Sequence, residues 1–590
     1  MSSLNDYFKK NKQVSFYILA ILAGLLSSLP LIFKGVDGAA HQDLAFHLSR
    51  IEGIKEGLLA GKFPVMMESV WIQGKGYPVA IFYGDLLLYF PALLRIIGIP
   101  VIASYKIFLL FVNVGTALLA YHCFKKCFDN ENGALIGTFL YMTAAYRFVD
   151  VYVRNAVGEY CAFLFFPLIA LAMFNILNKE TKDTKKYLLN SLLLAVGMTG
   201  LIETHLLSTV MTVFLLAIIC IIYVKRSLRP KTLACLGLAV LETLLLNVYY
   251  IVPFLDYYIN EPIYGGKGGV QGVAMEIRGS GAYLSQLFMF FQRPFGSNVS
   301  EVEYRMQLTV GLPLMLALVI CFVLFVLRFR DKRIFALGFM SVLCIWMSTD
   351  LFPWNTLEGY THLFKLLSKV QFPWRYLAPA TLFIALLFCD IYAKALKDVK
   401  VRNVVRLVGL CLVSVSVIMT AVFVYQYQRD YSMVDHKDYS EVDSGYMGAC
   451  EYLKNNTTLA GFSYVPANDS FESCELVSQK DNTCIFKIKN GNKENNLEVD
   501  KLNYKGYVAI SDDGNYLKTF DGYNDLITVV VPAGYEGNIK VTFKQPLYWV
   551  AAEIVSLISF IVLLALGIRS RLIQKQRDGR TIDILPDSEP

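Results

Sequence analysis

One stretch near the N-terminus decides how the rest of the chain is interpreted. It reads Gly38-Ala-Ala-His41-Gln-Asp43-Leu-Ala-Phe-His47-Leu-Ser-Arg50-Ile-Glu-Gly-Ile-Lys-Glu-Gly-Leu-Leu-Ala-Gly-Lys-Phe-Pro64. It follows the first apolar run and is too polar for the hydrocarbon core of a membrane. From Asp43 on, apolar and polar residues each recur at helical spacing. The apolar stripe is Leu44, Leu48, Ile51 and Leu58, and the polar stripe is Asp43, His47 and Arg50. We expect a helix in the membrane interface with its polar stripe facing an aqueous cavity; the alternative is a plain amphipathic linker.

The composition indicates a polytopic membrane protein. The 590 residues are 55% hydrophobic and 17% charged, with a mean hydropathy of +0.46, whereas soluble proteins carry about 25% charged residues. The net charge of +7 lies mostly in short loops, which is an orientation signal and predicts no nucleic-acid partner. Most of the twelve cysteines lie in apolar runs without zinc-site spacing, so we expect no thiol-based metal site.

Basic residues set the predicted topology. The chain has twelve candidate spans, which are 14–33, 101–123, 133–149, 160–177, 187–203, 206–224, 232–254, 308–327, 334–350, 376–393, 404–425 and 547–568. Their basic clusters all fall on one face, which the positive-inside rule makes cytoplasmic. Both termini are therefore expected inside the cell. Counting Tyr77–Ile99 as a span would invert this pattern, so we place it outside as a second interfacial or re-entrant helix.

The expected fold is mainly α, with residues 1–427 as a transmembrane module. Four long pieces face outward in this topology, namely 34–100, 256–306, 351–375 and 428–546. The last is polar and alternates in places between turn residues, which predicts a small extracellular β-domain before the last span, 547–568, and a cytoplasmic tail, 569–590. The glycine-rich piece 256–306 is either a lid or a plain solvent loop. A disulfide among Cys450, Cys474 and Cys484 is left open because their number is odd.

Ionisable side chains gather at the predicted outer ends of several spans. Such groups cost about 2.5–3.5 kcal/mol each at the membrane centre, so they usually line a cavity or pathway. Three polar stretches share the outer face with Asp43: Tyr146–Glu159, Glu203–His205 and Gln371–Tyr376. The candidate site residues are Asp43, His47, Asp150, Arg154, Glu159, His205, Trp374 and Arg375.

Several candidates also have purely structural explanations. Asp43 is a suitable helix N-cap, and Glu159 could cap the fourth span. Asp150 and Arg154, four residues apart, could be a helical ion pair rather than a sugar or phosphate site. His205 could stabilise a turn.

The remaining candidates are open in the same way. His47, like His41, suits hydrogen bonding better than metal binding. Trp374 and Arg375 could anchor the chain at the membrane interface. The planar donor fork of Arg375 suits a phosphate equally well.

Taken in order, these motifs resemble the GT-C glycosyltransferase superfamily, and within it the YfhO-like and "6-pyruvoyl-tetrahydropterin synthase related" bacterial membrane proteins. The motifs that carry the resemblance over nearly the whole chain are His41-Gln-Asp43-Leu-Ala-Phe-His47, Gly61-Lys-Phe-Pro64, Gly76-Tyr-Pro78, Phe82-Tyr-Gly84-Asp85, Tyr152-Val-Arg154-Asn-Ala-Val-Gly-Glu159, Glu203-Thr-His205-Leu-Leu-Ser, Phe372-Pro-Trp374-Arg375-Tyr and Val531-Pro-Ala-Gly534. The resemblance implies two interfacial helices in the first outer loop, a polyprenyl-phosphate-linked sugar donor, and Asp43 as the acid at the reaction centre. Asp150, Arg154 and Glu159 match the second-loop positions. The chain lacks an Asp-x-Asp pair and a Trp-Trp-Asp-like motif, so we expect no oligosaccharyltransferase, and a need for Mg or Mn stays open.

A sugar on a lipid phosphate already has a good leaving group, so the enzyme must deprotonate the acceptor and stabilise the phosphate. We expect Asp43 to be the base, with Arg154, Arg375 and His205 on the phosphate. Asp150 or Glu159 would orient sugar hydroxyls or a divalent cation. A single displacement would invert the anomeric centre. The acceptor would be a cell-envelope glycan, lipid or protein outside a bacterial plasma membrane.

Two other functions remain in competition. A transporter or flippase of lipid-linked glycans would favour repeated halves and ionisable groups at mid-membrane, where only Glu242 and Asn247 are candidates. A non-catalytic surface assembly protein would depend on residues 428–546 and tolerate changes at Asp43.

Overall fold

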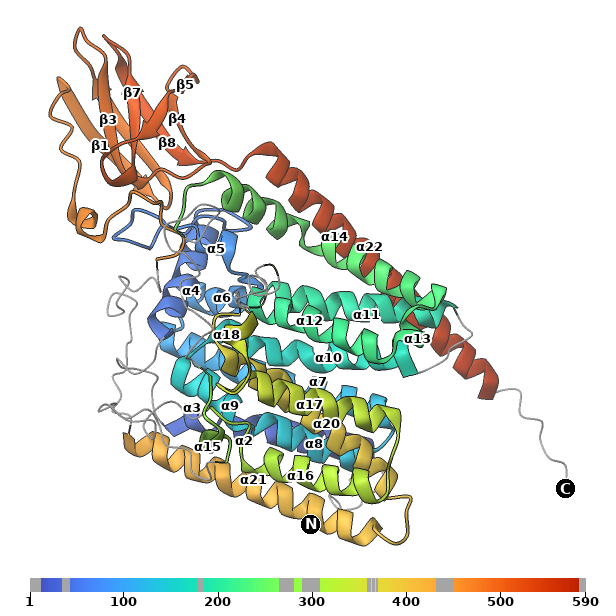
Figure 1. The fold of residues 1–590 in the computed structure, drawn as a ribbon. Helices are drawn as coiled ribbons and strands as arrows, with labels where there is room; N and C mark the ends of the chain where they lie inside the picture. Colours follow the sequence, from blue (N-terminus) through green and yellow to red (C-terminus); the bar gives the residue numbers. More distant parts are fainter. Residues whose placement is uncertain are drawn as a thin grey trace.

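The computed structural model describes residues 12–33, 43–178, 184–264, 281–288, 308–357, 362, 367, 370–430 and 450–582. Three parts of the sequence discussed above lie outside these residues. They are His41, residues 265–280 and 289–306 of the glycine-rich piece, and residues 431–449. Most of the described chain is helical, and many of the long helices run in the same general direction (Figure 1). Helices α14 (Pro230–Asn260) and α22 (Leu547–Ile582) pack along one another at one side of the bundle.

Each of the twelve predicted spans coincides with a helix. Besides α14 and α22, these are α2 (Lys12–Ser27) with α3 (Leu29–Phe33), α7 (Val101–Phe128), α8 (Glu131–Met142), α10 (Val157–Asn178), α11 (Thr184–Ile202), α12 (Leu206–Ile222), α16 (Leu312–Leu327), α17 (Lys332–Met347), α20 (Leu377–Ala395) and α21 (Arg402–Asp430). Among the described residues, six helices are long and apolar enough to cross a membrane. The chain is therefore a membrane protein, and the count of twelve crossings stays a prediction.

Two predicted boundaries differ from the structure. The third predicted span, 133–149, is interrupted after Met142, because the chain turns at Thr143 before the short helix α9 (Ala145–Phe148). The last helix does not stop at 568 but continues to Ile582, since neither proline nor glycine with a positive φ interrupts it.

The single helix predicted over Tyr77–Ile99 is wrong. The structure has three short helices there, α5 (Val79–Phe82), η1 (Leu86–Leu88) and α6 (Tyr89–Ile96). The chain breaks around Gly84, which lies against the backbone of Glu203. A Cβ on Gly84 would sit 2.5 Å from the carbonyl carbon of Glu203, so only glycine fits this close approach.

Helix α4 (Leu44–Leu59) forms where the first stretch predicts a helix, and the side chains of Leu44, Leu48 and Ile51 are buried. The predicted exposure of its polar stripe is wrong for His47 and Arg50, whereas Asp43 is half-buried. His47 and Arg50 are each only 1% exposed. They pack against Tyr83 from the following loop, with the Arg50 Cζ 4.3 Å from the centre of the Tyr83 ring.

Different helices lie at the two ends of the bundle (Figure 1). One end holds α4, α9, α15 (Leu284–Leu287) and α18 (Trp354–Leu357), and the other holds α13 (Val224–Ser227). At the second end, Arg333 pairs with the buried Asp390, and Arg328 pairs with Asp398 at 3.2 Å. The assignment of these ends to the outer and cytoplasmic faces stays a prediction.

Residues 473–543 form two antiparallel sheets. The strands are β1 (Ser473–Lys480), β2 (Thr483–Lys489), β3 (Asn495–Leu502), β4 (Tyr507–Ser511), β5 (Tyr516–Leu517), β6 (Thr519–Asp521), β7 (Leu526–Val531) and β8 (Glu536–Phe543). One sheet has the order β1-β2-β8-β4-β5, and the other has the order β3-β7-β6. Apolar side chains of both sheets form one core. We call this part the β-sandwich; Cys450, Cys474 and Cys484 all have free thiols, and its extracellular location stays a prediction.

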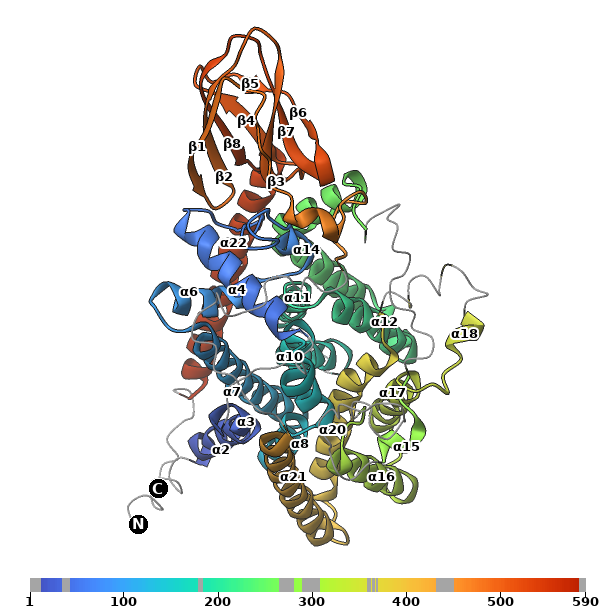
Figure 2. The same cartoon turned by 90° about the vertical axis from the view of Figure 1, so that its left-hand side faces the viewer.

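The β-sandwich packs against residues 43–100, which we call the first loop (Figure 2). Met67, Trp71 and Tyr77 of that loop belong to the same buried cluster as the sandwich core. The Asn482 Nδ2 donates to the Met67 carbonyl oxygen at 2.8 Å, and the Leu502 N–H donates to the Lys75 carbonyl oxygen at 3.0 Å. The first loop is thus held between the bundle and the β-sandwich.

A buried aspartate joins the β-sandwich to the helix pair α14 and α22. The Asp256 carboxylate accepts from the Lys505 Nζ at 2.6 Å and from the Trp549 Nε1 at 3.0 Å. It also accepts from the Tyr548 hydroxyl. The Asp256 side chain of α14 therefore contacts both the connection between β3 and β4 and the start of α22.

Candidate functional site

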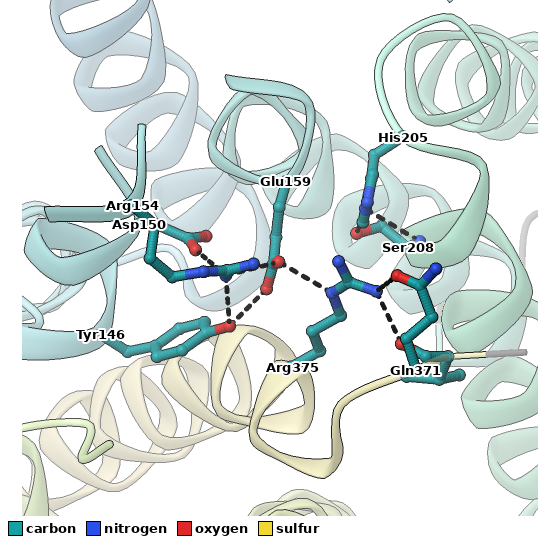
Figure 3. Close-up of polar contacts among 9 residues, drawn as sticks. Tyr146, Asp150, Arg154, Glu159, His205, Ser208, Gln371 and Arg375 are labelled. Carbon is teal, nitrogen blue, oxygen red and sulfur yellow. Dashed lines mark hydrogen bonds and ion pairs between the residues drawn. The ribbon is translucent and has the colours of Figure 1, made fainter. Parts of the chain in front are cut away.

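Glu159 is the centre of a buried charged cluster (Figure 3). It lies in the first turn of α10, where the helix dipole favours a negative charge. Its Oε2 accepts from the Arg154 Nη1 at 3.0 Å and from the Arg375 Nε at 3.1 Å, and its Oε1 accepts from the Tyr146 hydroxyl. The side chain of Glu159 is 1% exposed. One carboxylate therefore joins two guanidinium groups that are far apart in the sequence.

Arg154 comes from η2 (Val149–Arg154), a wide helical turn between α9 and α10. The turn ends at Asn155, which has a left-handed φ of 54° and redirects the chain into α10. The Arg154 Nη1 donates to the Asp150 Oδ1 at 2.6 Å. The helical ion pair weighed in the sequence analysis is therefore present. Burial raises the pKa of Asp150 and the nearby charge of Glu159 adds to this, while Arg154 partly offsets both.

Arg375 comes from η4 (Pro373–Tyr376), directly before α20. Its Nη1 donates to the Val370 carbonyl oxygen at 2.7 Å and to the Gln371 Oε1 at 2.9 Å (Figure 3). The guanidinium also lies 5.0 Å from the centre of the Phe372 ring. These contacts fix its orientation toward Glu159.

The side chain of Trp374 packs against the helix bundle, whereas that of its neighbour Arg375 reaches Glu159. Its ring stacks on Phe372 at 4.4 Å between centroids and packs against the core of the helix bundle. The Phe372 ring in turn contacts the Arg375 guanidinium. Its place in substrate binding stays a prediction.

Asp43 lies beside the cluster, at the N-terminus of α4. Its backbone N–H donates to the Arg154 carbonyl oxygen at 3.0 Å. It occupies the N-cap position, but its side chain makes no capping hydrogen bond, so capping does not account for the carboxylate. Burial raises the pKa of Asp43, and the charges of Arg154 and Arg375 act against that rise. The backbone of Asp43 therefore contacts that of Arg154, and the charges of both arginines act on its carboxyl group.

The two histidines have different surroundings. His205 is the N-cap of α12, where its Nδ1 accepts from the Ser208 N–H at 3.3 Å and lies 2.8 Å from the Ser208 Oγ (Figure 3). Burial lowers the pKa of His205 to about 3, and the charge of Arg375 contributes. His47 is buried beside Arg50, and its Nδ1 has no hydrogen-bond partner among the described residues. Burial and the charge of Arg50 keep the pKa of His47 well below its usual value.

Sequence reasoning did not assign roles to Tyr146, Gln371, Arg50 or Tyr83. Tyr146 and Gln371 each begin a polar stretch that was singled out, so their position next to charged residues was a usable signal. Arg50 shares the polar stripe of α4 with Asp43 and His47. Tyr83 lies in the motif Phe82-Tyr-Gly84-Asp85, but its position could not be predicted because its neighbours come from α4, α10 and the turn before α12.

The cluster has the groups that phosphate and hydroxyl chemistry need. Two guanidiniums can hold an anion, and a carboxylate with a raised pKa is a better proton acceptor than an ordinary one. A divalent cation at this site stays a prediction. Among the described residues, no group of three or more His, Cys, Asp or Glu side chains is arranged to hold a metal ion. The oxygens of Glu159 are also taken up by Arg154, Arg375 and Tyr146.

Comparisons with known proteins leave the family open. No family model matches the chain. A protein of Lactococcus lactis subsp. cremoris (strain MG1363), described as uncharacterized, is 22% identical over 377 residues. That match covers 59% of this chain and 56% of the relative, so the chain spans about half the length of the relative that it matches.

Two solved structures are similar to part of this chain at a low level. The arabinofuranosyltransferase AftD from Mycobacteria matches 70% of this chain and 27% of its own, at 12% identity and a TM-score of 0.39. ArnT from Cupriavidus metallidurans, solved with undecaprenyl phosphate, matches 71% of this chain and 76% of its own, at 11% identity and a TM-score of 0.40. Similarity at this level does not assign a function, and the GT-C and YfhO-like resemblance stays a prediction.

Proposed function

We propose that this chain is a membrane glycosyltransferase that takes a sugar from a polyprenyl-phosphate-linked donor. The acceptor is a cell-envelope glycan, lipid or protein on the outer face of a bacterial plasma membrane. The observation that carries the proposal is the meeting of Asp43, Arg154 and Arg375, which come from three separate parts of the chain. A carboxylate next to two guanidiniums suits a reaction that removes a proton while negative charge develops on phosphate.

In this mechanism Asp43 is the general base. Its carboxylate is not used to cap α4, and its raised pKa makes it a better proton acceptor. The acceptor oxygen forms a bond to the anomeric carbon while the bond from that carbon to the phosphate oxygen breaks. The proton of the acceptor passes to Asp43, and the electron pair of the broken bond goes to the phosphate. A single displacement inverts the anomeric centre.

Arg154 and Arg375 bind the phosphate in this proposal, and Glu159 positions them. Glu159 has both oxygens bonded to protein groups, which suits a positioning role better than direct contact with a sugar. Asp150 is paired with Arg154 in the same way. His205 has its Nδ1 engaged at the start of α12, so any contact with phosphate would use its other ring nitrogen.

The test replaces Asp43 by asparagine in the full-length chain. A deletion strain should lose one surface glycan, detected by mass spectrometry of the cell envelope. The wild-type gene should restore it, and Asp43→Asn should reduce the rate of restoration about 10²- to 10⁴-fold, the usual contribution of a general base. Asp398→Asn is a matched control, because Asp398 pairs with Arg328 at the opposite end of the bundle. Full restoration by a folded, membrane-inserted Asp43→Asn protein would remove Asp43 from this role.

A further inference from the structure

Tyr83 lies where the first loop meets the charged cluster. Its phenol oxygen packs against the backbone of Gly158, the residue before Glu159. A Cβ on Gly158 would lie 2.2 Å from that oxygen. The Tyr83 ring is 6.2 Å from the His205 ring and 5.9 Å from the His47 ring, measured between centroids. The phenol therefore sits at the N-terminus of α10, among the residues of the candidate site.

The hydroxyl of Tyr83 is a hydrogen-bond donor that no described residue uses. It has no hydrogen-bond partner in the described part of the chain, and the residue is half-buried. Nearby tyrosines differ, because the Tyr146 hydroxyl donates to Glu159 and the Tyr105 hydroxyl donates to Asn155. Burial raises the pKa of the Tyr83 phenol, which keeps its proton in place.

Arg50 holds Tyr83 in this position. Its Nη2 donates to the carbonyl oxygens of Tyr83 and Gly84, both at 2.8 Å. Its Cζ lies 4.3 Å from the centre of the Tyr83 ring, so the guanidinium also makes a cation–π contact. Because Arg50 is only 1% exposed, this arrangement fixes both the backbone and the ring.

We propose that the Tyr83 hydroxyl donates a hydrogen bond to the phosphate of the lipid-linked donor, and that Arg50 positions it. This inference rests on the proposed function, because that function supplies the phosphate. The phenol lies in the field of two arginines, Arg50 and Arg375, which the carboxyl groups of Asp43 and Glu159 partly offset. The N-terminus of α10 adds the positive end of its helix dipole. A phosphate offers acceptor oxygens to all three groups at once, which makes it the ligand that this set of donors favours.

The experiment measures undecaprenyl phosphate binding to the full-length protein in nanodiscs by native mass spectrometry. Wild-type protein should bind, and Tyr83→Phe should weaken binding about tenfold, since a hydrogen bond to a charged group is lost. Tyr89→Phe is the matched control, because the Tyr89 hydroxyl accepts from the Val65 N–H at 2.9 Å elsewhere in the loop. Binding of undecaprenol, which lacks the phosphate, should be the same for Tyr83→Phe and wild type.

Arg50→Lys tests the positioning role. Lysine keeps the charge but loses the planar fork, so we expect about fivefold weaker binding of undecaprenyl phosphate. In the Tyr83→Phe background the same change should add less than twofold, because Arg50 acts through the phenol. Unchanged binding by Tyr83→Phe, an equal loss of undecaprenol binding, or fully additive effects would overturn the inference. If wild-type protein does not bind undecaprenyl phosphate, the proposed function fails and the inference fails with it.

Discussion

Replacing Glu159 by glutamine tests whether one carboxylate holds the site together. The change keeps the size of the side chain but removes its charge. Glu159 accepts from Arg154 at 3.0 Å and from Arg375 at 3.1 Å. Breaking a buried ion pair by removing one partner costs about 3–5 kcal/mol. Arg154 keeps Asp150, whereas Arg375 keeps only the neutral acceptors of Val370 and Gln371 among the described residues. We expect the free energy of unfolding to fall by about 3–5 kcal/mol, with Arg375 bearing the larger loss.

The measurement is denaturant unfolding of the purified full-length protein, followed by tryptophan fluorescence. Glu498→Gln is the matched control for the change in chemistry. The Glu498 carboxylate accepts one side-chain hydrogen bond, from the Tyr464 hydroxyl at 2.6 Å. Losing part of that bond should cost only about 1 kcal/mol.

A second substitution separates charge from packing. In the Glu159→Gln background, Arg375→Gln removes the guanidinium left without its carboxylate and should recover part of the lost stability. The coupling between the two sites should be about 1–3 kcal/mol. A Glu159→Gln protein within about 1 kcal/mol of wild type, or double-variant losses equal to the sum of the single losses, would refute a bridging role for this carboxylate.

Two further predictions concern the first loop and the β-sandwich. Burial raises the pKa of Glu68 to about 8, so between its ordinary value and about pH 8 the folded state binds more protons than the unfolded state, and the stability contributed by this group falls as pH rises. Unfolding at pH 5, 6.5 and 8 should therefore give a flatter profile for Glu68→Gln than for wild type; identical slopes would contradict this. Asp256→Asn weakens the contact with Lys505 and Trp549. Limited proteolysis should therefore cut the links between the β-sandwich and the helix bundle several-fold faster. An unchanged cleavage rate would show that Asp256 does not hold the β-sandwich.

The helices could be predicted because long apolar runs specify them locally. The sequence also indicated strands in β7 and β8, where alternating apolar residues meet turn residues. The break at Gly84 could not be predicted, because it depends on the backbone of Glu203, which is distant in the sequence. The burial of His47 and Arg50 was missed for the same reason, since Tyr83 packs against both side chains.

The site could be predicted as a set of residues but not as a set of contacts. Polar side chains at helix ends pointed to Asp43, Arg154 and Arg375, because charges are costly near a membrane. The bridging role of Glu159 depends on an arginine 216 residues away, and no local pattern encodes that pairing. A structural role for His205 in a turn was among the alternatives, whereas its position as the N-cap of α12 was not predicted.

The shared core of the first loop and the β-sandwich affects how truncated and chimeric forms of this chain should be designed. Trp71 and Tyr77 of the first loop are both 0% exposed. Deleting residues 428–546 would expose these side chains, so the first loop would present apolar surface to water. Loss of activity in such a truncation would then indicate that the candidate site is disrupted, rather than that a recognition domain is missing. Chimeras between relatives should accordingly exchange the loop and the β-sandwich as one unit.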